Sequence, residues 1–434
     1  MIKTNARPWY LQFNYLAVFV YIIFTATLTV WGKTKLIGGM LILAAIARYV
    51  FFYARCGRRK MPVPLSLKFY TAWFSWCLIT GPLVAVNMGY FWSNIQVLFM
   101  VVVSLWCGYI LFSTQRQDSV VYTALFIIAI LNVIAVKMGV ELVREGDVQG
   151  LEVTGRILGE SRISGLKGNA NGLGILFLGG VWGGMMLWNE MRSSPSLRMV
   201  VIRVIIFVFM ALFSYLIGQT GSRKSFLTDV ILWIGWALWV VPGRITASSF
   251  FVRVFLAICV GIVAVSIVAF FMDDTLVGTR MHELFDAGGG SALAGVHEDI
   301  RWQFVLDGMR MLKNNPIAGV GYMQYIVNSV YGMFAHSDYI EQLASTGLVG
   351  FLIYQGFGLS IICKLWKLLK YPLPPAESYK IRGMILFMIT NHYLMCFGAT
   401  FAAMHYHVLI LLSFDICAER IAREYLMRFP VPNT

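Results

Sequence analysis

Long apolar stretches recur along this chain of 434 residues and constrain its fold more than any other feature. Hydrophobic residues make up 59% of the sequence and charged residues only 13%, with a mean hydropathy of +0.72. A soluble protein cannot cover its surface with so few polar side chains. The stretches have about the 20 residues that one helix needs to cross a bilayer, whereas a membrane β-barrel would show alternating segments of about ten. The composition therefore predicts an all-α, polytopic membrane protein.

Twelve apolar segments have about the length of a transmembrane helix. Twelve crossings place both termini on the same side of the membrane. If that side is the inner one, the basic stretches "ARCGRRK" (54–60) and "KLWKLLK" (364–370) fall in short inner loops. Because short cytoplasmic loops are rich in lysine and arginine, this pattern predicts cytoplasmic termini. The predicted segments are 13–31, 36–53, 69–86, 93–112, 120–138, 169–188, 199–217, 225–241, 254–272, 347–366, 383–402 and 404–418.

Two outer loops are too long and too polar to be simple turns. The first covers about residues 139–168. The second covers about 273–346 and contains nine of the chain's 21 acidic residues. Within it, "HEDIRWQFVLDGMRMLKNNP" has apolar residues at helical spacing and is closed by asparagine and proline, which predicts an amphipathic helix. We expect a single integral membrane domain over residues 1–434. The predicted apolar stripe of the amphipathic helix is Ile300, Phe304, Val305, Met309 and Leu312.

Composition also excludes several classes of partner. The net charge of +14 could indicate nucleic-acid binding, but the basic residues gather at the ends of apolar segments, where membrane insertion places them. The seven cysteines lie in the predicted spans or at their cytoplasmic ends, so we expect no disulfide in the outer loops. No spacing of cysteine and histidine is typical of a metal site. We therefore expect no nucleic acid, no metal and no cofactor.

Four basic residues stand at one level on the predicted outer side. Arg162 and Lys167 precede the sixth span in "SRISGLKGNANGLG", and Arg223 and Lys224 occupy the turn "GQTGSRKS" between the seventh and eighth spans. Arginine binds phosphate or carboxylate through paired hydrogen bonds, and the first amides of a helix favour anions. The pattern predicts an anion site. Contact of Arg223 and Lys224 with lipid headgroups, or an ion pair between Arg162 and Glu160, remain alternatives. The glycines of "GNANGLG" favour close helix packing, and its asparagines can cap the helix.

The second outer loop ends in "AHSDYIEQLASTGLVG", residues 335–350. Asp338 followed by Glu341 fits a capping box, so we expect a helix to begin at Asp338. A Ser-His-Asp triad is not expected, since adjacent residues rarely converge and no nucleophile elbow is present. His336 precedes the helix, whose positive end disfavours imidazolium. A neutral imidazole can accept a proton from a hydroxyl, which makes His336 a candidate general base. A structural role in the loop is the alternative.

Other ionisable residues lie within the predicted spans. His392, His405 and His407 are near the ends of the last two, and His405 and His407 would diverge on a helix, which argues against a metal pair. Asp229 and Asp415 could serve as proton-relay groups, which are typical of transporters.

The order of these motifs resembles the O-antigen ligase and O-antigen polymerase family of bacterial membrane glycosyltransferases. "SRISGLKGNANGLG" enters a span, "TGSRKS" lies between spans, and a long outer loop carries "NNPIAGVGY" followed by "AHSDYIEQLASTGLVG". The family typically has an R-x-x-G, a G-S-R turn, an N-P-x-x-G-x-G stretch and a histidine before L-x-x-x-G-x-x-G. The resemblance covers about residues 160–360. The chain departs from the family at Ala170, where proline is common, and at Ser337, where asparagine is usual.

The resemblance implies a fold related to polyprenyl-dependent, GT-C-like glycosyltransferases in the bacterial inner membrane. It implies inverting, metal-independent transfer of a glycan from undecaprenyl diphosphate, at the periplasmic face. By the same resemblance, Arg162 and Arg223 would bind the diphosphate, with help from Lys167 and Lys224. His336 would deprotonate or orient the acceptor hydroxyl.

The acceptor distinguishes two activities of this family. A ligase uses lipid A core, and a polymerase uses a second lipid-linked repeat unit; we favour the ligase slightly. Arg301 could contact the acceptor or form an ion pair with Asp299 or Asp307. Other candidate sugar contacts are Tyr322, Gln324 and Tyr339.

Two other classes of function remain to be weighed. A transporter or flippase of an anionic lipid predicts an inverted repeat and helices broken at the membrane midplane. The gathering of cations on the outer side argues against it. A structural scaffold in the membrane leaves those cations without an explanation.

Overall fold

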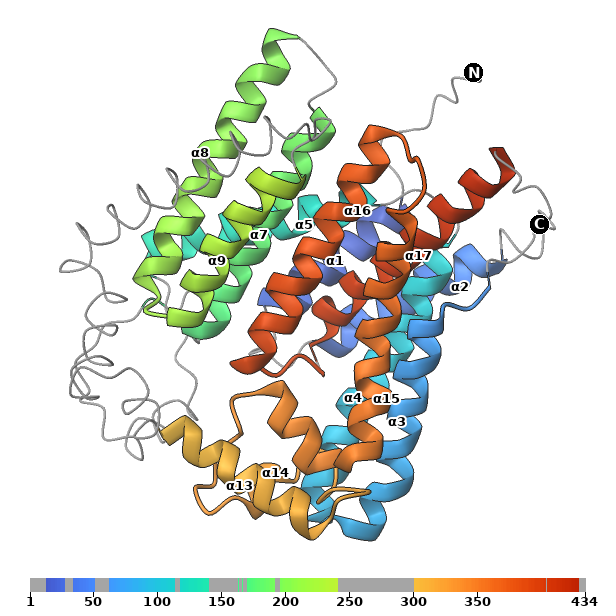
Figure 1. Cartoon of the computed structure of the whole chain (residues 1–434), viewed down its shortest axis with the longest axis vertical. Coiled ribbons are helices and arrows are strands. Elements are labelled where there is room, and N and C mark those ends of the chain that lie inside the picture. Colours follow the sequence, from blue (N-terminus) through green and yellow to red (C-terminus); the bar gives the residue numbers. More distant parts are fainter. Residues whose placement is uncertain are drawn as a thin grey trace.

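Every regular element that the computed structural model describes is a helix, which confirms the predicted all-α class for this part of the chain (Figure 1). The described residues are 13–27, 34–50, 62–113, 118–139, 163, 166, 170–191, 196–240, 300–402 and 404–428. The α-helices are α1 (Phe13–Thr27), α2 (Thr34–Tyr49), α3 (Leu65–Val84), α4 (Met88–Phe112), α5 (Asp118–Lys137), α7 (Ala170–Glu190), α8 (Leu197–Gln219), α9 (Arg223–Gly235), α13 (Ile300–Asn314), α14 (Tyr325–Asn328), α15 (Asp338–Leu368), α16 (Pro375–Phe387) and α17 (His405–Arg428).

Five helices of the described residues, α4, α5, α7, α8 and α15, are long and apolar enough to cross a membrane. The other predicted segments correspond to helices that are either shorter or less apolar than these five, except 254–272, which lies outside the described residues. The predicted segment 383–402 differs in one respect. Helix α16 ends at Phe387, and π-helical and 3-10 turns (Met388–Leu394 and Met395–Phe397) carry the chain onward. The predicted eleventh segment is therefore a helix that changes from α to π and then to 3-10 geometry and ends at Phe397.

Helix α7 lies between α5 and α8 and is almost entirely buried. Glycines on its surface let its neighbours approach closely. A Cβ on Gly183 would lie 2.6 Å from the backbone oxygen of Tyr122 in α5, and one on Gly180 would overlap Ala129. Small residues at helix contacts are typical of membrane proteins, where close packing replaces the hydrophobic effect as the force that joins helices.

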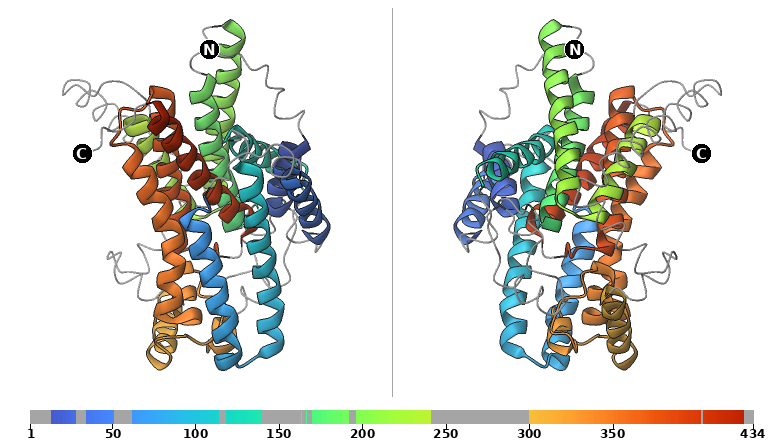
Figure 2. Two further views of the ribbon diagram at one scale, coloured as in Figure 1. Left: turned by 90° about the vertical axis from the view of Figure 1, so that its right-hand side faces the viewer. Right: turned by 90° about the vertical axis from the view of Figure 1, so that its left-hand side faces the viewer.

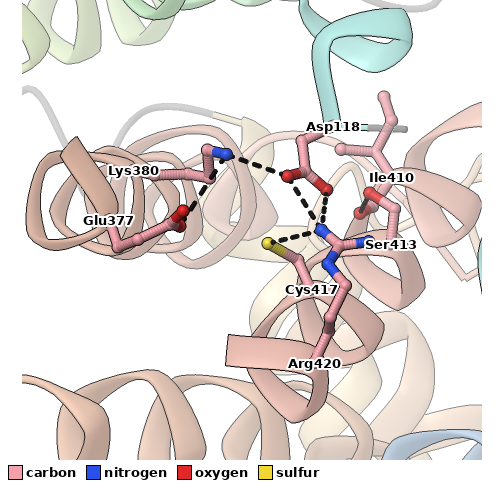
Figure 3. A network of polar contacts seen from close by, with 7 residues as sticks. All are labelled: Asp118, Glu377, Lys380, Ile410, Ser413, Cys417 and Arg420. Atoms are coloured by element: carbon pink, nitrogen blue, oxygen red, sulfur yellow. Dashed lines mark hydrogen bonds and ion pairs between the residues drawn. The ribbon is translucent and has the colours of Figure 1, made fainter. Parts of the chain in front are cut away.

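An ion cluster ties three helices together at one end of the bundle (Figure 3). Both carboxylate oxygens of Asp118 accept from Arg420 Nη2, at 2.7 and 2.9 Å, and Lys380 Nζ donates to Oδ2 at 3.0 Å. Arg420 also contacts Cys417 Sγ at 3.5 Å. The three charged residues come from α5, α16 and α17. All three residues lie in or next to segments that the positive-inside rule assigns to the inner side of the membrane. Their contacts therefore agree with the predicted topology.

Two other acids of the bundle differ in their surroundings. Asp415 forms an ion pair with Lys364 and accepts from the hydroxyl of Ser66, so its contacts tie α17 to α15 and α3. This arrangement favours a structural role over the proton relay that the sequence left open. Asp229 is buried in α9, where one of its carboxylate oxygens has no hydrogen-bond partner among the described residues.

Helices α13 and α14 form a small unit beside the turn between α3 and α4, at the end of the bundle opposite the top of α8 (Figure 2). The Gln324 side chain joins this unit to the turn, because it accepts from Asn87 N at 2.9 Å and donates to Asn87 O at 3.2 Å. The unit also has its own apolar core, formed by Met311, Val320, Tyr325, Ala335 and Ala344.

Helix α13 buries a different face from the one its apolar spacing predicts. Phe304, Asp307 and Met311 point inward, and Met309 is 46% exposed. The inward position of Asp307 is possible because its carboxylate binds Arg310 at 2.6 Å and accepts from Val330 N at 3.3 Å. Gly308 on the same face leaves room for Ile340 of α15. The predicted stripe is therefore wrong for Met309 and right for Phe304.

Helix α15 is broken at Gly347, whose φ of 66° and ψ of −176° are not helical. The break lies at the predicted start of the tenth span. The break leaves backbone groups of α15 without their usual hydrogen-bond partners inside the helix. Backbone groups of residues 316–321 form hydrogen bonds with them instead. The Trp76 indole also donates to Thr346 O at 3.0 Å. The three backbone hydrogen bonds run from Val320 N to Ala344 O, from Gly321 N to Ser345 O and from Leu348 N to Pro316 O, at 2.8 to 2.9 Å.

Two glycines make this backbone-to-backbone packing possible. A Cβ on Gly319 would lie 2.5 Å from Ala344 O, and one on Gly347 would lie 2.7 Å from Ala318 N and overlap Ile317 O. Both residues have positive φ, at 69° and 66°, a conformation in which side chains are strained. We refer to the three hydrogen bonds and these two glycines as the backbone stitch.

Replacing Gly347 with alanine should lower the free energy of unfolding by about 3 kcal/mol or more, because strain at positive φ adds to the displacement of 316–321. Thermal unfolding of the purified protein, followed by tryptophan fluorescence, measures the loss. Gly218→Ala is the control, since nothing lies within 4 Å of its added Cβ. Equal unfolding temperatures for the two variants would contradict the role of the stitch.

Candidate functional site

A small, shallow pocket, open to solvent, lies where α7, α9 and α13 meet the segment 395–398. Three of the described side chains that line it, Arg223, Lys224 and Arg301, are cationic, and none of these described residues is acidic. Such a concentration of positive charge in a hollow favours an anion. The lining residues are Asn171, Gly221, Ser222, Arg223, Lys224, Arg301, Met395 and Gly398.

The turn between α8 and α9 places two of these cations. Helix α8 ends at Gln219, and Gly221 turns the chain with a φ of 63°. Ser222 then caps α9 by accepting from the amide of Ser225, so Arg223 and Lys224 are the first two residues of the helix. Their charges therefore lie beside the positive end of the α9 dipole and its first amides, and all of these groups attract an anion.

Helix α7 is pressed against this turn by a glycine. A Cβ on Gly174 would lie 2.7 Å from Ser225 Oγ, so a larger residue would push the two helices apart. The expected packing role of "GNANGLG" is confirmed at this position. Asn171, one turn earlier on α7, lines the pocket as a result.

The floor of the pocket is the irregular segment 393–402, whose carbonyl groups accept from side chains of several other elements. Ser337 Oγ donates to Cys396 O at 3.2 Å, and Tyr339 OH donates to Tyr393 O at 2.9 Å. Lys224 Nζ donates to Phe397 O, and Tyr70 OH to Ala402 O. Irregular backbone is tolerated inside a membrane protein where it lines a cavity or is buried by protein. The side chains that donate to the segment 393–402 come from other elements and surround it with protein, as this rule requires.

Gly398 makes room for Lys224 at this floor. A Cβ on Gly398 would lie 2.5 Å from Lys224 Nζ and 2.9 Å from its Cε. The lysine ammonium can therefore reach the pocket only because residue 398 has no side chain.

His336 does not line the pocket, but two contacts connect it to elements that do. Its ring packs against Phe304 of α13, with ring centroids 5.8 Å apart, and Phe304 is one helical turn beyond Arg301. Its neighbour Ser337 bonds Cys396, which follows the lining residue Met395. The side chain is exposed, and its φ is 52°, in the left-handed region.

Tyr325 fixes the surface on which the His336 ring lies. Its hydroxyl donates to Phe304 O at 2.6 Å, which ties α14 to α13. Burial raises the pKa of Tyr325, with neighbouring carboxylates adding to the effect, so the hydroxyl keeps its proton at physiological pH. A hydrogen bond between two uncharged groups therefore holds Phe304, the residue on which the His336 ring packs.

The start of α15 confirms one expectation and corrects another. The helix begins at Asp338, as the capping-box pattern predicts. Asp338 is not the cap, however. Ser337 occupies that position without a capping hydrogen bond, because its hydroxyl binds Cys396 O instead. Glu341 reaches back to accept from Ala335 N at 3.2 Å, and Asp338 points inward, where it accepts from Tyr354 OH at 2.7 Å.

Other predicted site residues lie outside the described residues, at the pocket or next to its floor. Arg162 and Lys167 lie outside the described residues. Arg301 lines the pocket; of its two suggested partners, Asp307 binds Arg310 and Asp299 lies outside the described residues. Tyr339 is half-buried and holds the floor segment, as described above.

Tyr322 and Gln324 are buried away from solvent. Tyr322 is 2% exposed and packs edge-on against Trp73, with centroids 5.6 Å apart. Gln324 is fully buried and bonds the Asn87 backbone. Their burial favours a structural role over the predicted contact with sugar, because the loop that carries them folds back against α3 and α4.

Sequence reasoning missed Asn171, Ser222, Met395 and Gly398 as lining residues. Asn171 had been considered only as a helix cap. For Met395 and Gly398 the available signal was "CFGAT", a glycine and a threonine that interrupt an apolar segment. Such an interruption can indicate a break in a helix, although it says nothing about which pocket the break faces.

The three late histidines lie deeper in the bundle. His392 Nδ1 and His407 Nε2 are 3.3 Å apart, whereas His405 Nδ1 lies 2.7 Å from Tyr21 OH. His405 and His407 therefore diverge, as their spacing predicts. Among the described residues, no group of three or more His, Cys, Asp and Glu could hold a metal ion.

Residues 205–355 match a protein-family model described as O-antigen ligase. The match includes the turn with Arg223 and Lys224, the start of α13 with Arg301, the loop with His336 and the break at Gly347. The resemblance that the motifs indicate is thereby confirmed. No match is found among curated proteins.

Gly398→Ala should displace the ammonium of Lys224 without unfolding the protein, because the methyl group meets only the end of a flexible side chain. We expect the variant to bind inorganic diphosphate about tenfold more weakly than the wild type, the effect of losing one charged hydrogen bond. Calorimetry on the purified protein in detergent measures the affinity, with Gly218→Ala as the control. Unchanged affinity in Gly398→Ala would exclude Lys224 from anion binding.

Proposed function

We propose that this chain, a member of the O-antigen ligase and polymerase family, transfers a glycan from undecaprenyl diphosphate to a sugar hydroxyl. The observation that carries the proposal is the pocket that Arg223, Lys224 and Arg301 line, together with His336, whose ring packs on Phe304, one helical turn from Arg301. A leaving diphosphate needs positive charge, and an attacking hydroxyl needs a base. The pocket and His336 provide both.

The cations act on the leaving group. As the bond between the anomeric carbon and the diphosphate oxygen breaks, negative charge grows on the phosphate. Cations fixed beside it stabilise the transition state more than the ground state and so raise the rate. Arg223 and Lys224 add to the positive end of α9, and Arg301 approaches from α13. We therefore assign Arg301 to the diphosphate, in place of the acceptor contact that its sequence position suggested.

Arg162 and Lys167 extend this assignment. Both precede Ala170, the first residue of α7, and Asn171 lines the pocket. We propose that they approach the same diphosphate from the α7 side. The clustered cations replace the divalent metal that binds diphosphate in many other transferases, so the reaction needs no metal or other cofactor.

His336 acts on the acceptor. Its imidazole accepts the proton of the acceptor hydroxyl while that oxygen attacks the anomeric carbon, and the diphosphate leaves from the opposite face with the bonding electrons. A single displacement of this kind inverts the configuration of the anomeric carbon. The exposed position of the side chain supports the role, since an acceptor must approach from solvent.

The membrane arrangement follows from the same placement. We propose twelve spans, with both termini in the cytoplasm, the pocket at the periplasmic face of the inner membrane and a fold related to GT-C-like transferases. The ion cluster of Asp118 and the cation pocket support this arrangement, because each joins residues of one predicted side. We favour lipid A core as the acceptor, which makes the protein a ligase, over a second lipid-linked repeat unit, the acceptor of a polymerase.

A flippase of an anionic lipid is a second candidate, favoured by the irregular backbone between α16 and α17. The side chains that bind its carbonyls argue for a fixed floor instead of a moving gate. The two functions differ in product, since a flippase moves the donor without changing a bond.

Transfer can be tested with the purified protein, an undecaprenyl-diphosphate glycan, a chelator and either lipid A core or a second lipid-linked repeat unit. We expect product with the chelator present. His336→Ala should slow turnover about a hundredfold or more, and Arg223→Ala and Arg301→Ala should do so by a similar factor. Mass spectrometry of the product identifies the acceptor used.

Lys313→Ala is the matched control, because Lys313 is an exposed cation on α13 that does not line the pocket. It should retain wild-type activity. Full activity of folded His336→Ala and Arg223→Ala variants would overturn the mechanism. Movement of intact donor across vesicles, without transfer to either acceptor, would identify a flippase instead.

A further inference from the structure

We propose that the hydrogen bond from Tyr354 to Asp338 is a strut across the break at Gly347, and that both are positioning residues for His336. The inference rests on the proposed function for its catalytic consequence. Its structural part rests on the geometry of α15 alone. Neither residue lines the pocket, so neither is assigned to touch the substrate.

The distance between the two residues along the chain shows what the break does. Sixteen residues separate Asp338 from Tyr354, and a straight helix of that length spans about 24 Å. Yet Tyr354 OH donates to Asp338 Oδ2 at 2.7 Å. The two side chains can meet only because the chain turns sharply at Gly347 and brings residues 338–346 back beside the span. The hydrogen bond closes this turn and fixes the angle between its two arms.

Burial makes the strut strong. Asp338 is fully buried, and Tyr354 is 2% exposed and packs against Trp73 of α3, with centroids 4.8 Å apart. A carboxylate removed from water needs partners, and Tyr354 provides the shortest hydrogen bond that Asp338 accepts from a side chain. Gln342 donates to its other oxygen at 3.4 Å. Loss of the Tyr354 hydroxyl would therefore leave the carboxylate with a weaker set of contacts and the arm with a weaker hold on the span.

The strut also reaches the floor of the pocket. Cys396 Sγ lies 3.8 Å from Asp338 Oδ2, and Ser337, the preceding residue, donates to Cys396 O. The buried carboxylate of Asp338 therefore joins three parts of the chain. These are the short arm of α15 (338–346), its long arm (348–368) and the segment that accepts a hydrogen bond from Lys224. The position of the candidate base therefore depends on contacts that join both parts of α15 to the floor segment.

The backbone conformation of His336 needs such a hold. Its side chain is exposed and its φ is 52°, a conformation that residues with side chains keep only where the surroundings enforce it. The residues that follow it, Ser337 and Asp338, are both buried and both bonded to other elements. The strut therefore sets where the imidazole stands relative to the acceptor.

Tyr354→Phe removes the strut and keeps the aromatic ring. We expect kcat to fall about tenfold while KM for the donor stays within about twofold of the wild type, because the cations are untouched. In a His336→Ala background, Tyr354→Phe should cause no further loss, since it acts through His336. Amide exchange of residues 331–338, measured by mass spectrometry, should quicken, while that of 223–235 should not change.

Tyr122→Phe is the matched control. Tyr122 is fully buried, and its hydroxyl has no hydrogen-bond partner among the described residues. It should leave kcat and the exchange of 331–338 unchanged. Asp338→Asn provides a second test of the strut from its other end and should also lower kcat with KM unchanged.

The outcomes separate this inference from the proposed function. Wild-type kcat and wild-type exchange in Tyr354→Phe would overturn the strut, even if transfer itself is confirmed. Equal losses for Tyr354→Phe in the wild-type and His336→Ala backgrounds would also overturn it. Faster exchange of 331–338 in a protein that transfers no glycan would support the strut and reject the transferase.

Discussion

The backbone stitch between residues 316–321 and the break in α15 is the constraint on which the outer half of the structure depends. Three hydrogen bonds and two glycines with positive φ hold α13 and α14 against the start of a membrane helix. Without them, Arg301 would not face Arg223, and the ring of Phe304 would not lie under His336. The stitch is made of backbone alone, so it leaves the side chains of the unit available for the pocket.

The pocket illustrates how a membrane protein gathers charge where bilayer insertion gives no reason for it. The cations are not spread over a surface. They stand at the first turn of α9, at the start of α13 and over a floor of carbonyl groups. Each of these positions is at the end of an element, where unpaired backbone groups are already polar. The site therefore lies where helix ends already leave polar backbone groups without partners inside the helix.

Much of the fold could be predicted from the sequence, because the apolar content of some 20 residues determines whether a segment becomes a membrane helix. The boundaries of α4, α5, α7 and α8 follow that rule closely. The inward face of α13 could not be predicted in the same way. It depends on Arg310 and Val330 as partners for Asp307 and on the closeness of Ile340 to Gly308, which are contacts between distant segments.

The site was predictable to a similar degree. Arg223, Lys224 and His336 stand out because charge and polarity are unusual in such a chain, and the structure brings the two cations into one pocket while the histidine packs on Phe304 of α13. Arg301 was recognised but given another role. The burial of Tyr322 and Gln324 could not be predicted, because a polar loop suggests exposure, whereas this one folds back on the bundle. The floor at 395–398 depends on donors from distant elements and has no local signature.

The break at Gly347 has a consequence for the length of the segment before it. Residues 338–346 form a helix anchored at both ends, by the strut at one and by the stitch at the other. Each residue of an α-helix advances by 1.5 Å and turns by about 100°. Inserting or deleting a single residue there would swing the imidazole to another side of the arm, although every side-chain type remained the same. The number of residues between His336 and Gly347 therefore determines on which side of the arm the imidazole lies.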